Sequence, residues 1–84
     1  MHYVYILQTE YNNETYIGCT NDLQRRIVEH NSGKVSSTKK KIPYTLIHYE
    51  AFLNQQDAFA REQFLKTGWG KKFIKKNLRH YFHD

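Results

Sequence analysis

The sequence predicts one small α+β domain, residues 1–84, in which helices surround a single sheet in the order β-β-α-β-α-α. Eighty-four residues provide for one hydrophobic core and leave no room for a second. Hydrophobic residues make up 39% of the chain and aromatic residues 15%, a composition typical of globular proteins. Strand-like and helix-like hydrophobic patterns follow one another along the chain, and they predict the order of the elements.

The first two strands are expected to form a hairpin. His2–Gln8 is rich in β-branched and aromatic residues, and Thr15–Gly18 reads as a short second strand. Asn12–Asn13 tolerates positive φ, so a two-residue turn is expected there. Because side chains alternate along a strand, any turn of even length places Tyr5 and Tyr16 on the same face.

Caps and apolar periodicity predict three helices and one further strand. Asn21 is expected to cap a first helix over about Asp22–Asn31, with Gln24 completing a capping box. Gly33 is expected to end this helix and to begin a basic loop. The later elements are expected as a strand and two helices over Tyr44–Glu50, Gln55–Thr67 and Lys71–Arg79.

The charge of the chain indicates a polyanionic partner. Thirteen Lys and Arg against eight Asp and Glu give a net charge of +5, which suits nucleic acid, although a basic balance also aids solubility alone. Seven lysines gather in two clusters and are predicted to form a positive rim that contacts phosphates: Lys39, Lys40, Lys41, Lys71, Lys72, Lys75 and Lys76.

Several classes of protein are excluded by composition. The single cysteine, Cys19, excludes an intrachain disulfide framework and a multi-cysteine zinc site. The longest apolar run, Tyr3–Leu7, is far too short to span a membrane. No basic segment followed by a long apolar stretch suggests a signal peptide, so a cytoplasmic location is expected.

Glu62 does not fit a purely structural account of the second helix. At 100° per residue it falls within the apolar stripe formed by Ala58, Leu65 and Trp69. An ionised carboxylate is rarely buried without a partner. Glu62 is therefore either an edge residue paired with Lys66 four positions later, or a cleft residue that holds a cation.

Four further residues are candidates for chemistry. Arg26 and His30 lie four positions apart on the first helix, where Arg can grip a phosphate and His can position or shuttle a proton. The alternative is two solvated helix residues. Tyr5 and Tyr16 share a face of the hairpin, and they border a polar cleft or simply pack at the rim of the sheet.

These residues together resemble the GIY-YIG nuclease family, in particular its small single-domain branch. The resemblance covers about residues 3–79, and the stretch YIGCTNDLQRRIVEHNSG carries most of it. The ordered set that carries it consists of Tyr3-Val4-Tyr5, Tyr16-Ile17-Gly18, Arg26, His30 and a lone Glu62. Tyr3 stands in place of the glycine that names the family.

The resemblance implies a three-stranded antiparallel sheet flanked by helices, and metal-assisted hydrolysis of phosphodiester bonds. It makes Tyr16 the general base or the residue that orients the attacking water, with Tyr5 beside it to tune it. Arg26 would stabilise charge in the transition state, and His30 would hydrogen-bond a tyrosine or relay its proton. Glu62 would hold one divalent cation, Mg²⁺ or Mn²⁺.

The expected substrate is nucleic acid, DNA in preference to RNA, cut with low sequence specificity or by selection of its structure, as in DNA repair. A protein partner that supplies targeting is compatible with so short a chain. One alternative is a non-catalytic nucleic-acid-binding module that keeps the nuclease fold. Another is a small interaction protein whose basic helices bind RNA or a protein.

Overall fold

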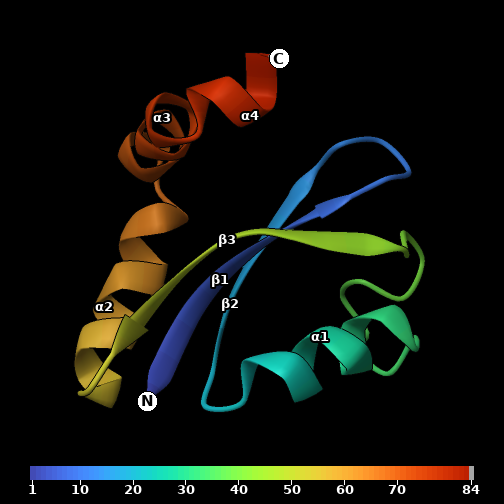
Figure 1. Cartoon of the computed structure of the whole chain (residues 1–84), viewed down its shortest axis with the longest axis horizontal. Helices are drawn as coiled ribbons and strands as arrows, with labels where there is room; N and C mark the ends of the chain where they lie inside the picture. Colours follow the sequence, from blue (N-terminus) through green and yellow to red (C-terminus); the bar gives the residue numbers. More distant parts are fainter. Residues whose placement is uncertain (84) are drawn as a thin grey trace.

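The computed structural model describes residues 1–83 and confirms the predicted fold class. Its three-stranded antiparallel sheet has the order β2-β1-β3, with β1 in the centre. Helix α1 lies on one side of the sheet, and α2 continues into α3 and α4 on the other side (Figure 1). The elements are β1 (His2–Thr9), β2 (Thr15–Thr20), α1 (Leu23–Asn31), β3 (Tyr44–Phe52), α2 (Gln55–Leu65), α3 (Gly68–Asn77) and α4 (Arg79–His83).

The central strand β1 is buried on both faces because each face packs on its own core. Val4 and Ile6 face α2 and α3, where they contact a buried cluster that includes Leu65. Tyr5 and Leu7 face the opposite side, toward α1. The alternation of aliphatic and aromatic residues along β1 thus separates an aliphatic core from a tyrosine-rich core.

The hairpin has a longer turn than predicted, but the number of residues in the turn is even, as the prediction required. The turn is wider than two residues, because the Thr9 amide donates to the Glu14 carbonyl across a four-residue connection, in which Asn13 has a φ of 65°. Four is an even number, so Leu7 still pairs with Tyr16, and the side chains of Tyr5 and Tyr16 share a face.

Several helix boundaries also differ from the prediction: α2 and α3 each end two residues earlier than expected, and the starts of α1 and α3 differ. Asp22 caps α1, and its side chain accepts from the Arg25 amide; the expected cap was Asn21. The third helix begins at Gly68, because the Thr67 side chain caps it, so Trp69 belongs to α3 and is exposed instead of extending the stripe of α2. A fourth short helix, α4, follows beyond the three that were predicted.

The corner between α2 and α3 is a close contact of backbones. A Cβ atom on Gly70 would lie 2.1 Å from the carbonyl oxygen of Phe64 and 2.4 Å from the Cα of Leu65. Only a residue without a side chain fits this approach. On α3, Ile74 is buried, whereas Phe73 is partly exposed and packs on Phe64.

Candidate active site

Tyr5 and Tyr16 meet on the side of the sheet that faces α1. Their ring centroids lie 6.4 Å apart, and Tyr5 is fully buried whereas Tyr16 is partly exposed. Tyr5 lies opposite Gly18 in the hairpin, and a Cβ atom at that position would lie 2.4 Å from the Tyr5 hydroxyl oxygen. Gly18 therefore makes room for the Tyr5 hydroxyl, a role that the sequence pattern did not indicate.

His30 connects the two tyrosines to α1. It is fully buried in the last turn of that helix, and its Nε2 lies 2.8 Å from the Tyr5 hydroxyl oxygen. The centroid of its ring lies 4.9 Å from that of Tyr16. The other ring nitrogen, Nδ1, lies 2.8 Å from the hydroxyl oxygen of Thr38, which is also fully buried. Of the two interpretations of His30, a solvated helix residue is wrong.

Thr38 was not among the residues predicted from sequence. It belongs to the segment between α1 and β3, which was described only as a basic loop, and no periodicity marks a buried residue there. The segment is held against the sheet at its far end by the Thr9 side chain, which donates to the Lys41 carbonyl. The Asn31 side chain bonds the backbone N–H and carbonyl of Tyr44 at 2.7 and 3.0 Å.

Arg26 lies one turn before His30 and close to the Tyr5 hydroxyl. Burial raises the pKa of Tyr5, and the neighbouring Arg26 guanidinium partly opposes that rise. Burial also lowers the pKa of His30, and the charge of Arg26 lowers it further. Both groups are therefore neutral near pH 7. The Arg26 guanidinium itself donates to the Glu29 carboxylate at 3.1 Å, so it is ion-paired in this structure.

Glu62 approaches the site from the other side of the sheet. Its carboxylate raises the pKa of Tyr5 and also that of Cys19, whose side chains point to opposite faces. Since α2 packs on β2, and β2 is an edge strand, Glu62 acts on both residues from the edge of the sheet. The Glu62 side chain is only 15% exposed, and it pairs with Lys66 at 3.1 Å, as one of the two sequence interpretations expected.

At this edge of the sheet, a divalent cation would have one carboxylate ligand, that of Glu62. Within residues 1–83, no group of three or more His, Cys, Asp or Glu side chains forms a metal site. A single carboxylate oxygen suits Mg²⁺ or Mn²⁺, which keep several waters and take phosphate oxygens as further ligands. Glu62 fits such a cation once Lys66 moves away, and the Lys66 side chain is 48% exposed and free to turn into solvent.

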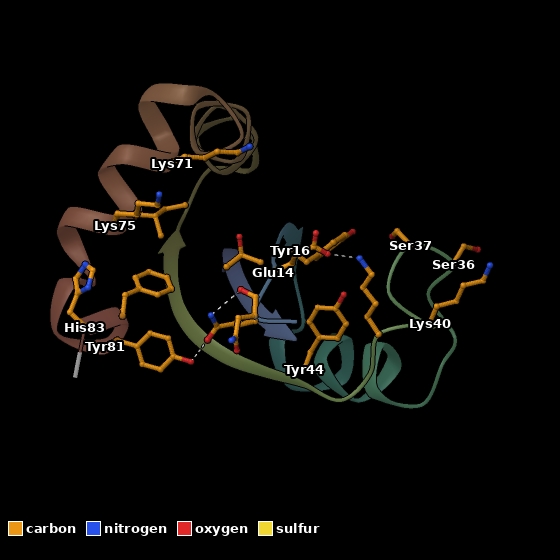
Figure 2. A pocket seen from close by; sticks show the side chains of 16 residues that line it. Glu14, Tyr16, Ser36, Ser37, Lys40, Tyr44, Lys71, Lys75, Tyr81 and His83 are labelled. Atoms are coloured by element: carbon orange, nitrogen blue, oxygen red, sulfur yellow. Dashed lines mark hydrogen bonds and ion pairs between the residues drawn. The ribbon is translucent and has the colours of Figure 1, made fainter. Parts of the chain in front are cut away.

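Tyr16 opens onto a groove of about 1170 Å³, shown in Figure 2. Lys71 and Lys75 of α3 lie on one side of it, and Lys40 with Ser36 and Ser37 lies on the other. We call it the basic groove because four of the seven predicted rim lysines line it: Lys40, Lys41, Lys71 and Lys75.

The other predicted residues lie outside the lining of the basic groove. Lys72 is on α3 with its ammonium 5.1 Å from the Trp69 ring centroid, and Lys39 and Lys76 are exposed. Arg26 lines a separate cavity of about 320 Å³ together with Thr20 and Glu29. The structure thus clusters Tyr5, Tyr16, Arg26 and His30, sets Glu62 at the sheet edge beside them, and divides the lysines.

A carboxylate is part of the basic groove as well. Glu14 lines it and pairs with the Lys41 ammonium group, which reduces the positive charge at that point. Tyr81 of α4 reaches across and donates to the Gln8 side chain, as the dashed line in Figure 2 indicates. Neither side chain was among the site residues predicted from the sequence.

The fold and the site define a GIY-YIG catalytic domain, and the family model of that description matches residues 1–77. The chain belongs to the GIY-YIG family, a family of nucleases. Within residues 1–83, no helix combines the length and the apolarity that a membrane crossing requires.

Its relatives are small proteins of one group. A UPF0213 protein of Bacillus pumilus is 40% identical over 78 residues, which cover 92% of this chain and 76% of that protein. A UPF0213 protein of Halobacterium salinarum is 39% identical over 67 residues, covering 79% and 86%. The solution NMR structure of a UPF0213 protein from Bacillus halodurans matches with a TM-score of 0.55 at 34% identity, over 87% of this chain and 80% of that one.

Proposed function

We propose that this protein is a metal-dependent endonuclease that hydrolyses phosphodiester bonds in DNA, with weak sequence specificity or with selection of DNA structure. The observation that carries the proposal is the cluster of Tyr5, Tyr16 and His30 with the Arg26 guanidinium beside it, of which Tyr16 lines the basic groove. A hydrogen-bonded tyrosine next to a permanent positive charge suits proton transfer at a phosphate.

The exposed tyrosine is the one that can meet the attacking water. Tyr16 lines the basic groove, so its hydroxyl orients the water or takes its proton. Tyr5 is buried behind it and tunes the site through its bond to His30. Arg26 leaves Glu29 and donates to the phosphate oxygens, where negative charge increases in the transition state.

The metal assignment rests on the chemistry of one donor. Glu62 would hold the cation, which when bound supplies positive charge to the leaving 3′ oxygen. A site with one protein carboxylate binds metal weakly without substrate, because phosphate oxygens complete the shell. In the described chain Lys66 pairs with Glu62 and no second carboxylate joins it, so the cation would have one protein ligand there.

In this proposal the basic groove binds the nucleic acid and positions it. Lysine contacts to phosphates fix a nucleic acid in place without reading its bases, so low sequence specificity follows. Glu14 offsets only one of the four groove lysines, Lys41, and the remaining three stay available for phosphates. The groove is open to solvent and continuous with Tyr16, which brings a bound backbone to the tyrosine that meets the attacking water.

The test is cleavage of labelled nicked, branched and single-stranded DNA with Mg²⁺ or Mn²⁺. Glu62→Gln should abolish metal-dependent cleavage, because it removes the charge that holds the cation. Its free energy of unfolding should stay within about 0.5 kcal/mol of the wild type, since an ion pair four residues apart on a helix is worth about 0.3–0.5 kcal/mol. Arg26→Ala should lower the rate about 10²–10³-fold.

Matched controls are Glu10→Gln and Arg79→Ala, which change exposed side chains away from the site and should cut normally. DNA binding should survive both site substitutions, because the groove lysines carry most of it. If Glu62→Gln cuts as well as the wild type, the metal assignment is wrong.

The alternative function is a nucleic-acid-binding module without turnover. The observation that favours it is that both site charges are neutralised within their own helices, Arg26 by Glu29 and Glu62 by Lys66. Tight binding in the absence of cleavage, with every metal and every substrate above, would establish this alternative.

A further inference from the structure

A chain of buried polar groups runs from the site into the protein interior. It links Tyr5, His30 and Thr38, whose exposed fractions are 1%, 0% and 0%. The two contacts, Tyr5 hydroxyl to Nε2 and Nδ1 to the Thr38 hydroxyl, are both 2.8 Å long. Water has no access to replace either bond, so the proton positions depend on the protein groups alone.

The two ends of the chain fix its direction. At the inner end, the Thr38 hydroxyl lies 3.5 Å from the backbone carbonyl oxygen of Val35, and a carbonyl can only accept. This long contact favours donation from Thr38 to Val35, which leaves a lone pair of the Thr38 oxygen to accept from His30. At the outer end, the Arg26 guanidinium lies beside the Tyr5 hydroxyl, and a guanidinium can only donate.

A neutral imidazole carries one proton, so its two nitrogens have opposite roles. An Nδ1 that donates to Thr38 leaves Nε2 without a proton, and Nε2 then accepts from the Tyr5 hydroxyl. His30 is neutral near pH 7 because burial lowers its pKa, and Tyr5 keeps its proton because burial raises its pKa. The proposed hydrogen-bond chain requires both a neutral His30 and a protonated Tyr5.

We propose that Thr38 is a positioning residue that holds His30 in the Nδ1–H tautomer and thereby directs the bare Nε2 at Tyr5. The hydroxyl of Tyr5 then donates inward, and its oxygen lone pairs face Arg26 and the site. Tyr5 keeps this proton, and its oriented lone pairs hold the Arg26 guanidinium beside Tyr16, the tyrosine that meets the reacting water in the proposed function.

The catalytic consequence rests on the proposed nuclease function, whereas the tautomer does not. The tautomer requires the hydroxyl group of Thr38 and does not require its methyl group. Thr38→Val removes the hydroxyl at nearly constant volume, and Thr38→Ser keeps it. The wrong tautomer of a catalytic histidine costs activity even when the fold is intact.

The direct test is the side-chain ¹H–¹⁵N NMR spectrum of the histidines at pH 7.5, with His30 assigned by its loss in His30→Gln. We expect a pyrrole-type Nδ1 and a pyridine-type Nε2 for His30 in the wild type and in Thr38→Ser. Thr38→Val should shift His30 toward the Nε2–H tautomer. An Nε2–H tautomer in the wild type overturns the proposal even if Thr38→Val fails to fold. An unchanged tautomer in a folded Thr38→Val also overturns it.

Nuclease activity provides the second measurement. Thr38→Val should lower kcat about tenfold or more with KM unchanged, and Thr38→Ser should restore it. A wild type that shows the Nδ1–H tautomer but cuts no substrate contradicts the proposed function and leaves the role of Thr38 supported. A Thr38→Val variant with the altered tautomer and normal kcat overturns the positioning role in catalysis.

Discussion

Gly18→Ala is expected to be among the most destabilising single-methyl substitutions in this chain. The new Cβ atom would lie 2.4 Å from the Tyr5 hydroxyl oxygen and 2.5 Å from Tyr5 Cζ. Ordinary contact begins at 3.4 Å, so the hydroxyl end of Tyr5 must move by about 1 Å. Tyr5 is 1% exposed and has no solvent to move into.

Two costs follow from this displacement. Overpacking of a filled core costs about 1–3 kcal/mol. Loss of the 2.8 Å bond to His30 leaves a buried nitrogen unpaired, at a cost of about 1–3 kcal/mol. We expect Gly18→Ala to lower the free energy of unfolding by about 2–6 kcal/mol in total, and the melting temperature by at least about 8 °C.

The assay is urea unfolding, with Gly68→Ala as the matched control. A Cβ atom on Gly68 would meet nothing within 4 Å, and Gly68 lies at the start of α3, so the same added methyl should be neutral or slightly stabilising. In a Tyr5→Phe background, Gly18→Ala should cost less than in the wild type, because the bond to His30 is already lost. Equal stabilities of Gly18→Ala and Gly68→Ala would refute the steric argument.

Three further outcomes are expected. DNA binding should weaken steeply with salt, and Lys75→Gln, which changes a groove lysine, should reduce the salt slope by about 0.9, whereas Lys76→Gln on the same helix should change it little; equal effects would contradict the assignment of the basic groove. Burial lowers the pKa of His30, so the unfolded chain binds its proton more readily. Stability should therefore be level above pH 7 and fall as the pH drops below about 6.5, more in the wild type than in His30→Gln; urea titrations that show no such fall would contradict it. Gly70→Ala should destabilise by at least about 2 kcal/mol in thermal unfolding, because its Cβ meets backbone that cannot turn aside, and a melting temperature like that of Gly68→Ala would contradict this.

The sheet and its two faces were predictable because they depend on short-range alternation. Tyr5 and Tyr16 were placed on one face although the turn between the strands was predicted wrongly, since parity depends only on an even number of connecting residues. The first three helices were predictable from their caps and apolar residues, but the first residues of α1 and α3 were not, and α4 was not predicted. Both Asn21 and Asp22 can cap a helix, and the choice between them depends on the exit of β2.

The site was predictable only as a set of residue types. Thr38 escaped prediction because its contact with His30 depends on the path of an irregular loop, which no sequence period records. Glu62 was recognised as unusual for its helix, but its place beside Tyr5 depends on the strand order, which makes β2 an edge. The division of the lysines was also hidden, because the facing of α3 depends on where Thr67 starts it.

The close backbone contact at Gly70 couples the positions of α2 and α3. Since the two backbones approach closely there, a change in the angle between these helices would disturb this contact. Glu62 belongs to α2, and Lys71 and Lys75 belong to α3. In the proposed complex with nucleic acid, a shift of α3 toward the phosphates would be transmitted through this corner to the helix that carries Glu62, the proposed metal ligand.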